Sequence, residues 1–128
     1  MNRLLIEQAK ATPKVDFDPN SCVLRIEGQS YPENSFKFYE PVFAWVDEYL
    51  ANSKAPLTVN ITLSYLNTSS SKCMLMLLDK LEDAFRDGQA VVLNWSCDAD
   101  NESEWECAEE FKEEVTFPFN IIPLTEEC

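Results

Sequence analysis

The clearest pattern in the chain is a stretch, residues 56–65, in which apolar and polar residues alternate one by one. Its apolar positions are Val59, Ile61, Leu63 and Tyr65. Because successive side chains of a strand point to opposite faces, this stretch predicts a strand with one apolar and one polar face. A strand buried on both faces would be apolar throughout. We therefore expect one face of the sheet to be open to water and the helices to cover the other.

Helical spacing of apolar residues flanks this strand on both sides. Before it, capping and breaker residues at 31–35 precede apolar positions at Phe38, Val42, Trp45, Val46 and Tyr49. Pro41 lies inside that pattern, and we expect it in the first turn of the main helix, with a short helical turn before it. After the strand, small capping residues at 67–71 precede a second helix that Asp87-Gly88 ends. Its apolar stripe is Met74, Leu77, Leu78, Leu81 and Phe85.

Further strands are expected at 3–8, 14–18, 22–28, 89–96 and 117–124, and an acidic third helix at 101–115. Turn residues at 18–21 predict that 16–28 forms an antiparallel hairpin. N-terminal strands and hairpin (3–28) are thus followed by helix–strand units (35–124). The expected fold is one α/β domain over 1–128: a two-layer sandwich with a mixed, mostly parallel sheet, helices mainly on one face and the last strands in sequential order.

Charge narrows the possible partners. Ten basic and 23 acidic residues give the 128-residue chain a net charge of −13. An acidic surface repels phosphate backbones and anionic lipids, so we expect no nucleic-acid or membrane partner, whereas a basic protein surface fits. No apolar run has the length of a membrane span, and charge interrupts the first residues too early for a signal peptide, which predicts a cytoplasmic protein. The five cysteines, which include no C-x-x-C pair, are then expected to be thiols.

The residues needed for common catalytic chemistry are scarce. The chain has no histidine and two glycines, so neither a Ser-His-Asp triad nor a glycine-rich phosphate loop can be built from it. We predict that the protein is not an enzyme and carries no cofactor. A divalent-metal site at 98–109 is a minor alternative, because acidic residues there follow the spacing of a calcium loop. Ser103 stands where that loop requires glycine, which favours a solvated acidic helix start.

The segment between the alternating strand and the second helix is rich in hydroxyl groups. It consists of Asn67, Thr68, Ser69, Ser70, Ser71 and Lys72. In open α/β sheets, ligands and partners bind at this strand-to-helix edge. One hydroxyl is enough for an N-cap, so the surplus indicates an exposed phosphoacceptor whose phosphate would gain from the free amides of the helix. An ordinary helix cap is the alternative interpretation.

At these residues the chain resembles the SiaC family of bacterial regulatory phosphoproteins. The matching segments are 12–13 (TP), 15–18 (VDFD), 28–34 (GQSYPEN), 38–42 (FYEPV), 65–72 (YLNTSSSK) and 118–120 (PFN). The likeness covers nearly the whole chain, and its most specific part is the tyrosine-to-lysine run at 65–72. The cysteine-bearing tail at 125–128 departs from the pattern and is expected to be dispensable.

The resemblance implies a STAS-like fold and a function. It implies that Thr68 is phosphorylated by a cognate Ser/Thr kinase of the histidine-kinase-like ATPase type, and that a PP2C-type phosphatase reverses this. It also implies that the unphosphorylated form binds and activates a diguanylate cyclase, which raises cyclic di-GMP and favours biofilm. We expect residues 67–72 to form the docking surface, where a phosphate dianion would block the cyclase. A rival hypothesis is a module that binds a basic partner through helix 101–114, independently of phosphorylation.

Overall fold

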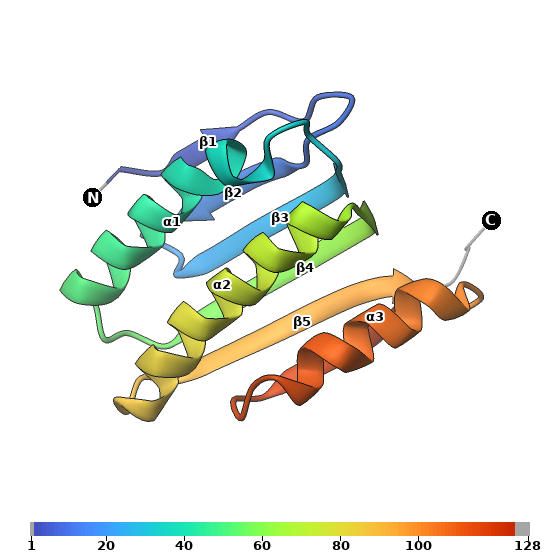
Figure 1. Cartoon of the computed structure of the whole chain (residues 1–128). Helices are drawn as coiled ribbons and strands as arrows, with labels where there is room; N and C mark the ends of the chain where they lie inside the picture. The colour runs from blue at the N-terminus through green and yellow to red at the C-terminus, as the bar shows by residue number, and fades with distance from the viewer. Residues whose placement is uncertain (1, 125–128) are drawn as a thin grey trace.

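Six strands form one sheet whose spatial order follows the order of the chain (Figure 1). The structure is a computed structural model that describes residues 2–124; the tail at 125–128, with Cys128, lies outside the described residues. The strands are β1 (Leu4–Ile6), β2 (Lys14–Asp18), β3 (Val23–Ser30), β4 (Leu57–Leu66), β5 (Val91–Asp98) and β6 (Phe119–Leu124). β1, β2 and β3 pair antiparallel, and β3 to β6 pair parallel. The predicted hairpin and the sequential, mostly parallel sheet are confirmed.

Three helices cover one face of this sheet (Figure 1). They are α1 (Ser35–Asn52), α2 (Thr68–Arg86) and α3 (Glu102–Glu113). Each helix follows a parallel strand, so all three begin at the edge where β3, β4 and β5 end. This edge, which we call the carboxyl edge, brings together strand ends and helix N-termini that are far apart in sequence.

The two faces of the sheet differ as the alternation predicts. On the covered face, Leu57, Val59, Ile61 and Leu63 of β4 are all buried in the core. The opposite face carries a row of amides in register across three strands: the Asn94 Nδ2 donates to Asn60 Oδ1 at 3.0 Å, and the Asn120 Nδ2 donates to Asn94 Oδ1 at 3.1 Å. The prediction of one open, polar face is confirmed.

Two sequence-based expectations are wrong. Tyr65 was expected on the apolar face of β4, but its side chain is 54% exposed. The pairing of β3 with β4 shifts register between Gly28 and Gln29, and Ser64 becomes an extra residue that ends the alternation. Pro41 does not begin the main helix: α1 runs without a break from Ser35, where the Asn34 side chain caps it, and Pro41 lies inside. Among residues 2–124, no helix has the length and apolar character to cross a membrane.

Candidate functional site

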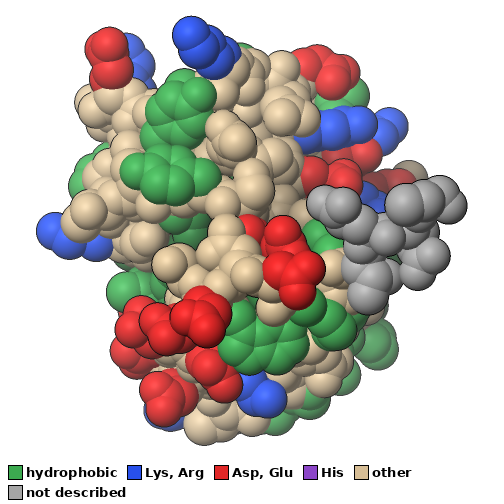
Figure 2. All heavy atoms as spheres, turned by 90° about the vertical axis from the view of Figure 1, so that its right-hand side faces the viewer, with side chains coloured by type: hydrophobic (Ala, Val, Ile, Leu, Met, Phe, Trp, Pro, Cys, Tyr) green, Lys and Arg blue, Asp and Glu red, His purple; other side chains and the backbone are tan. Residues whose placement is uncertain are grey.

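The segment 67–72 lies at the carboxyl edge, between the end of β4 and the first turn of α2. The backbone N–H of Asn67 donates to the backbone carbonyl of Ser30 at 3.0 Å, which holds the end of β4 against the end of β3. Figure 2 looks onto this edge, and its middle is drawn mostly in tan, the colour of backbone and uncharged polar groups, above a gathering of acidic side chains. The segment itself carries one charged residue, Lys72, on a strongly acidic protein.

Asn67 is the N-cap of α2. Its Oδ1 accepts a hydrogen bond from the Ser70 amide at 2.8 Å, and its carbonyl accepts one from the Ser71 amide at 3.0 Å. Its Nδ2 also donates to the Pro32 carbonyl at 3.3 Å, which ties the cap to the loop before α1. Asn67 thus supplies the cap that the sequence had assigned to the segment as a whole.

Thr68, the first residue of α2, is exposed. Its hydroxyl has no hydrogen-bond partner among the described residues, whereas the neighbouring serine hydroxyls do. Lys72 lies four residues further, on the same side of the helix, and is also exposed. Thr68 and Lys72 therefore face solvent and lie apart from the polar groups beneath them.

Under Thr68, five hydroxyl groups form a chain that joins three elements. Oxygen–oxygen distances along it are 2.8 Å (Tyr39–Ser30), 2.8 Å (Ser30–Ser70), 3.0 Å (Ser70–Ser35) and 2.7 Å (Ser35–Ser69). Its last member, the Ser69 hydroxyl, reaches Asn67 Oδ1 at 3.3 Å. The chain therefore locks the starts of α1 and α2 to the end of β3.

The first part of the chain has one direction, because each hydroxyl carries a single proton. Ser30 donates to Ser70, so Tyr39 donates to Ser30 and Ser70 donates to Ser35. The Ser35 and Ser69 hydroxyls both reach Asn67 Oδ1, at 3.4 Å and 3.3 Å, and one of the two donates to it while accepting from the other. Burial raises the pKa of Tyr39 to about 12, and the bond to Ser30 opposes this only in part. The phenol is therefore neutral at physiological pH and available as the first donor.

The structure thus divides the predicted residues into two groups. Thr68 and Lys72 are exposed; Asn67, Ser69 and Ser71 are half-buried; and Ser70 is fully buried. In this conformation Ser70 supports the surface from beneath and does not reach a partner. Sequence reasoning missed Ser30, Ser35 and Tyr39. The position of Ser70 on the apolar stripe of α2, three and four residues before Cys73 and Met74, indicates that it needs a buried polar partner.

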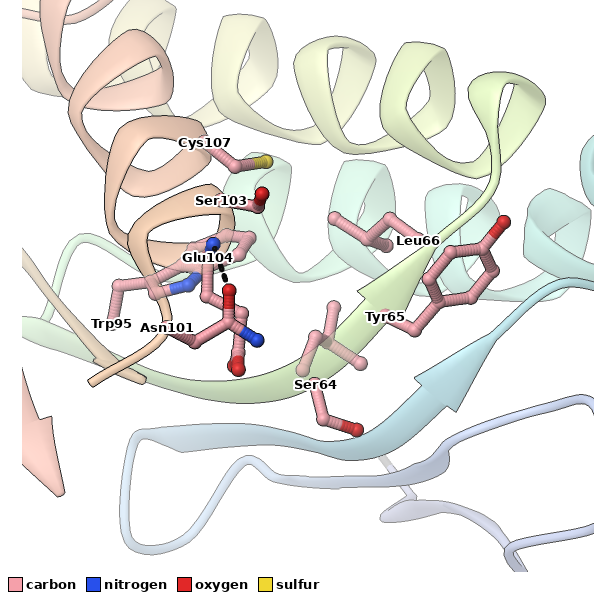
Figure 3. A pocket seen from close by; sticks show the side chains of 9 residues that line it. Ser64, Tyr65, Leu66, Trp95, Asn101, Ser103, Glu104 and Cys107 are labelled. Carbon is pink, nitrogen blue, oxygen red and sulfur yellow. Dashed lines mark hydrogen bonds between the residues drawn. The ribbon is translucent and has the colours of Figure 1, made fainter. Parts of the chain in front are cut away.

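A cavity of about 250 Å³ adjoins the segment on its other side, between the end of β4 and the start of α3. Leu63, Leu66 and Trp95 line its apolar part, and Asn101, Ser103 and Glu104 line its polar part. Asn101 is the N-cap of α3, accepting from the Glu104 amide at 3.1 Å (Figure 3). The sequence analysis did not single out this cavity, because its residues come from three separate segments.

The acidic stretch at 98–109 forms a strand end, a turn and the first two turns of α3. Among residues 2–124, no three Asp, Glu, Cys or His side chains converge as a metal-ligand set. The four cysteines that the structure describes are free thiols, and burial raises the pKa of Cys73, Cys97 and Cys107.

Comparison with known proteins gives consistent matches over nearly the whole chain. The family described as "SiaC family regulatory phosphoprotein" matches residues 6–124. An uncharacterized protein of Pseudomonas aeruginosa (strain UCBPP-PA14) is 43% identical over 121 residues, which cover 94% of this chain and 96% of that protein.

Solved structures agree with this match. The crystal structure of apo-SiaC from Pseudomonas aeruginosa is 42% identical, with a TM-score of 0.91, and the match covers 95% of this chain and 99% of that one. SiaC also matches in a crystal structure of the diguanylate cyclase SiaD in complex with its activator SiaC, at 42% identity and a TM-score of 0.91, over 94% and 99% of the two chains.

Proposed function

The chain belongs to the SiaC family of regulatory phosphoproteins, and from this premise we propose that it is a phosphorylation-controlled activator of a diguanylate cyclase. As a member of that family it is a regulatory protein and not an enzyme, as the sequence predicts. In the proposed cycle, the unphosphorylated protein binds and activates the cyclase in the cytoplasm, which raises cyclic di-GMP and favours biofilm. A Ser/Thr kinase of the histidine-kinase-like ATPase type phosphorylates Thr68 and ends the interaction, and a PP2C-type phosphatase restores it.

The exposure of Thr68 carries this proposal. A kinase can reach the Thr68 hydroxyl in the folded protein, whereas Ser69 and Ser70 hold their protons in the buried chain. Adding a phosphate to Thr68 breaks none of the hydrogen bonds beneath it. The modification can therefore change the surface while the domain stays folded.

The physical basis of the switch is the desolvation of charge. A phosphothreonine carries about two negative charges at neutral pH. Burying that dianion without partners in an interface costs several kcal/mol, and each 1.4 kcal/mol lowers affinity about tenfold. Lys72, one helical turn away, can pair with the phosphate, but exposed pairs contribute about 1 kcal/mol or less and leave most of this cost in place.

Binding of the cyclase before and after phosphorylation tests the proposal. We expect Thr68→Ala to bind as the unphosphorylated wild type does, and the phosphorylated protein and Thr68→Glu to bind at least tenfold more weakly. Ser21→Glu is the matched control, because Ser21 is an exposed hydroxyl in the β2–β3 turn at the opposite edge of the sheet. Equal affinity of the cyclase for quantitatively phosphorylated and unphosphorylated protein would refute the mechanism.

The surface of α3 supports a second candidate function, in which a basic partner binds independently of phosphorylation. A surface groove of about 420 Å³ beside Ile121 is lined by four glutamates and one lysine: Glu106, Glu109, Glu110, Glu113 and Lys112. Charge reversal at Glu109 and Glu110 would then weaken partner binding more than Thr68→Glu does, and binding would fall steeply with added salt.

A further inference from the structure

The cavity between β4 and α3 adjoins the proposed phosphorylation site. Figure 3 shows Leu66 extending toward α3, Ser103 and Cys107 projecting from α3 toward β4, and Tyr65 pointing away. Leu66 directly precedes the cap residue Asn67, so the cavity and Thr68 lie on the same edge of the molecule. A partner that covers Thr68 therefore also meets the mouth of this cavity.

The size and lining of the cavity indicate what it holds. Its volume of about 250 Å³ is below the roughly 300–1,000 Å³ of small-molecule pockets. Leu63 and Trp95 at its floor are 3% and 2% exposed, so an apolar group placed there would be removed from water on several sides. A single apolar side chain fits this space, and burying one contributes about 1.5–3 kcal/mol.

The acidic residues around the mouth of the cavity favour a basic residue next to the apolar side chain that a partner inserts. No lysine or arginine lines the cavity, and Glu104 makes no ion pair among the described residues. Asp98, Asp100 and Glu102 lie in the same turn and helix start. An anionic ligand is repelled here, whereas a cationic side chain finds an unpaired carboxylate.

We propose that this cavity is the anchor point of the diguanylate cyclase, which inserts one apolar side chain over Trp95 and places a flanking lysine or arginine against Glu104. The inference rests on the proposed function and deepens it. The anchor explains how one phosphate weakens a whole interface. The dianion on Thr68 would lie beside the apolar contact in the cavity, from which water must be excluded. The basic neighbour lies on the α3 side of the cavity, away from Thr68.

Two variants with matched controls test the anchor. Ser103→Trp places a bulky ring at the mouth of the cavity, and Ser21→Trp makes the same change at an exposed position on the opposite edge. Glu104→Lys reverses the charge at the cavity, and Glu48→Lys makes the same change at an exposed position near the end of α1. Cyclase binding to each folded, unphosphorylated variant is measured by calorimetry at low and high salt.

We expect Ser103→Trp and Glu104→Lys each to weaken binding at least tenfold, with both controls within twofold of wild type. We also expect Glu104→Lys to bind with a smaller salt dependence than wild type. If the wild type binds and both cavity variants bind within twofold of it, the anchor is refuted while the proposed function stands. If the wild-type protein does not bind the cyclase, the proposed function fails and the anchor fails with it. If Ser103→Trp does not fold, Glu104→Lys alone decides between these results.

Discussion

Removing the Ser70 hydroxyl is the most direct test of the buried hydroxyl chain. In Ser70→Ala, Ser30 loses the acceptor of its proton. If the Ser30 proton turns toward Tyr39, the phenol loses its own acceptor, so one buried donor is left without a partner in either arrangement. Leaving a buried donor unsatisfied costs about 1–3 kcal/mol. We therefore expect Ser70→Ala to lower the free energy of unfolding by about 2 kcal/mol.

Ser71→Ala is the matched control for this change. Ser71 is half-buried in the same helical turn, and its hydroxyl makes no hydrogen bond among the described residues. Both substitutions gain the same few tenths of a kcal/mol in helix propensity, so their difference isolates the chain. Urea denaturation followed by tryptophan fluorescence measures it, and a thermal scan should show a difference of roughly 8 °C for a domain of this size. A difference below about 0.5 kcal/mol would show that the chain contributes nothing.

Tyr39→Phe tests the direction of the chain. Tyr39 is its first donor, so removing this hydroxyl takes away a proton and an acceptor but orphans no other donor. The expected loss is about 1 kcal/mol, half that of Ser70→Ala. The wild type should also lose stability as pH rises from about 10 through the folded-state pKa of about 12, and this loss should be smaller in Tyr39→Phe, in which Tyr49 and the buried thiols, whose pKa values are also raised, still contribute. A larger loss for Tyr39→Phe than for Ser70→Ala would reverse the assigned direction.

Two further predictions concern residues away from the site. Burial raises the pKa of Glu82, but hydrogen bonds from the Thr116 amide and hydroxyl and from Arg86 lower it more, so the pKa lies below its ordinary value of 4.5. The carboxylate therefore stabilises the fold above pH 4.5, and this stabilisation is lost as pH falls through the lowered pKa. The urea midpoints of wild type and Glu82→Gln should converge as pH is lowered. Midpoints that keep a constant difference across this pH range would contradict the prediction. Gly28 (φ +126°) and Gly88 (φ +101°) both hold a backbone conformation that L side chains rarely adopt, and the Cβ added at Gly28 would come closest to Nε2 of the exposed Gln8 side chain, at 2.9 Å, which can turn away. Gly28→Ala and Gly88→Ala should therefore each destabilise the protein by about 1–3 kcal/mol in the same assay, and a loss below about 0.5 kcal/mol for either would contradict this.

The fold was predictable because its layers follow from local patterns. Strict alternation over 57–63 requires one open sheet face, and helix–strand units on a single face require strands in sequential order. The features that the sequence did not predict depend on contacts with other elements of the fold. The bulge opposite Gly28 that exposes Tyr65 exists only because β3 and β4 pair, and Pro41 is tolerated inside α1 because the caps and packing of the whole helix offset one lost hydrogen bond.

In the candidate site, too, the features set by the local sequence were predictable and those set by contacts with other elements were not. Helical periodicity alone places Ser70 with Met74 and Leu77 on the buried stripe and Thr68 with Lys72 on the exposed one. It does not reveal that Ser30, Ser35 and Tyr39 complete the chain, because they come from other elements.

The hydroxyl residues at the start of α2 therefore have different roles and do not duplicate one another. Successive residues of a helix point about 100° apart, so a residue that faces solvent and a residue that faces the core can be neighbours in sequence. Thr68 can serve as the proposed phosphoacceptor because Asn67 caps the helix and Ser70 holds it to the core. The direction in which each side chain points fixes which residue has which role. It follows that Ser70 cannot replace Thr68 as a phosphoacceptor unless the first turn of α2 unwinds. Incubating Thr68→Ala with the kinase should then yield no phosphate on Ser70, and phosphopeptide mapping that finds Ser70 modified in folded protein would overturn this division of roles.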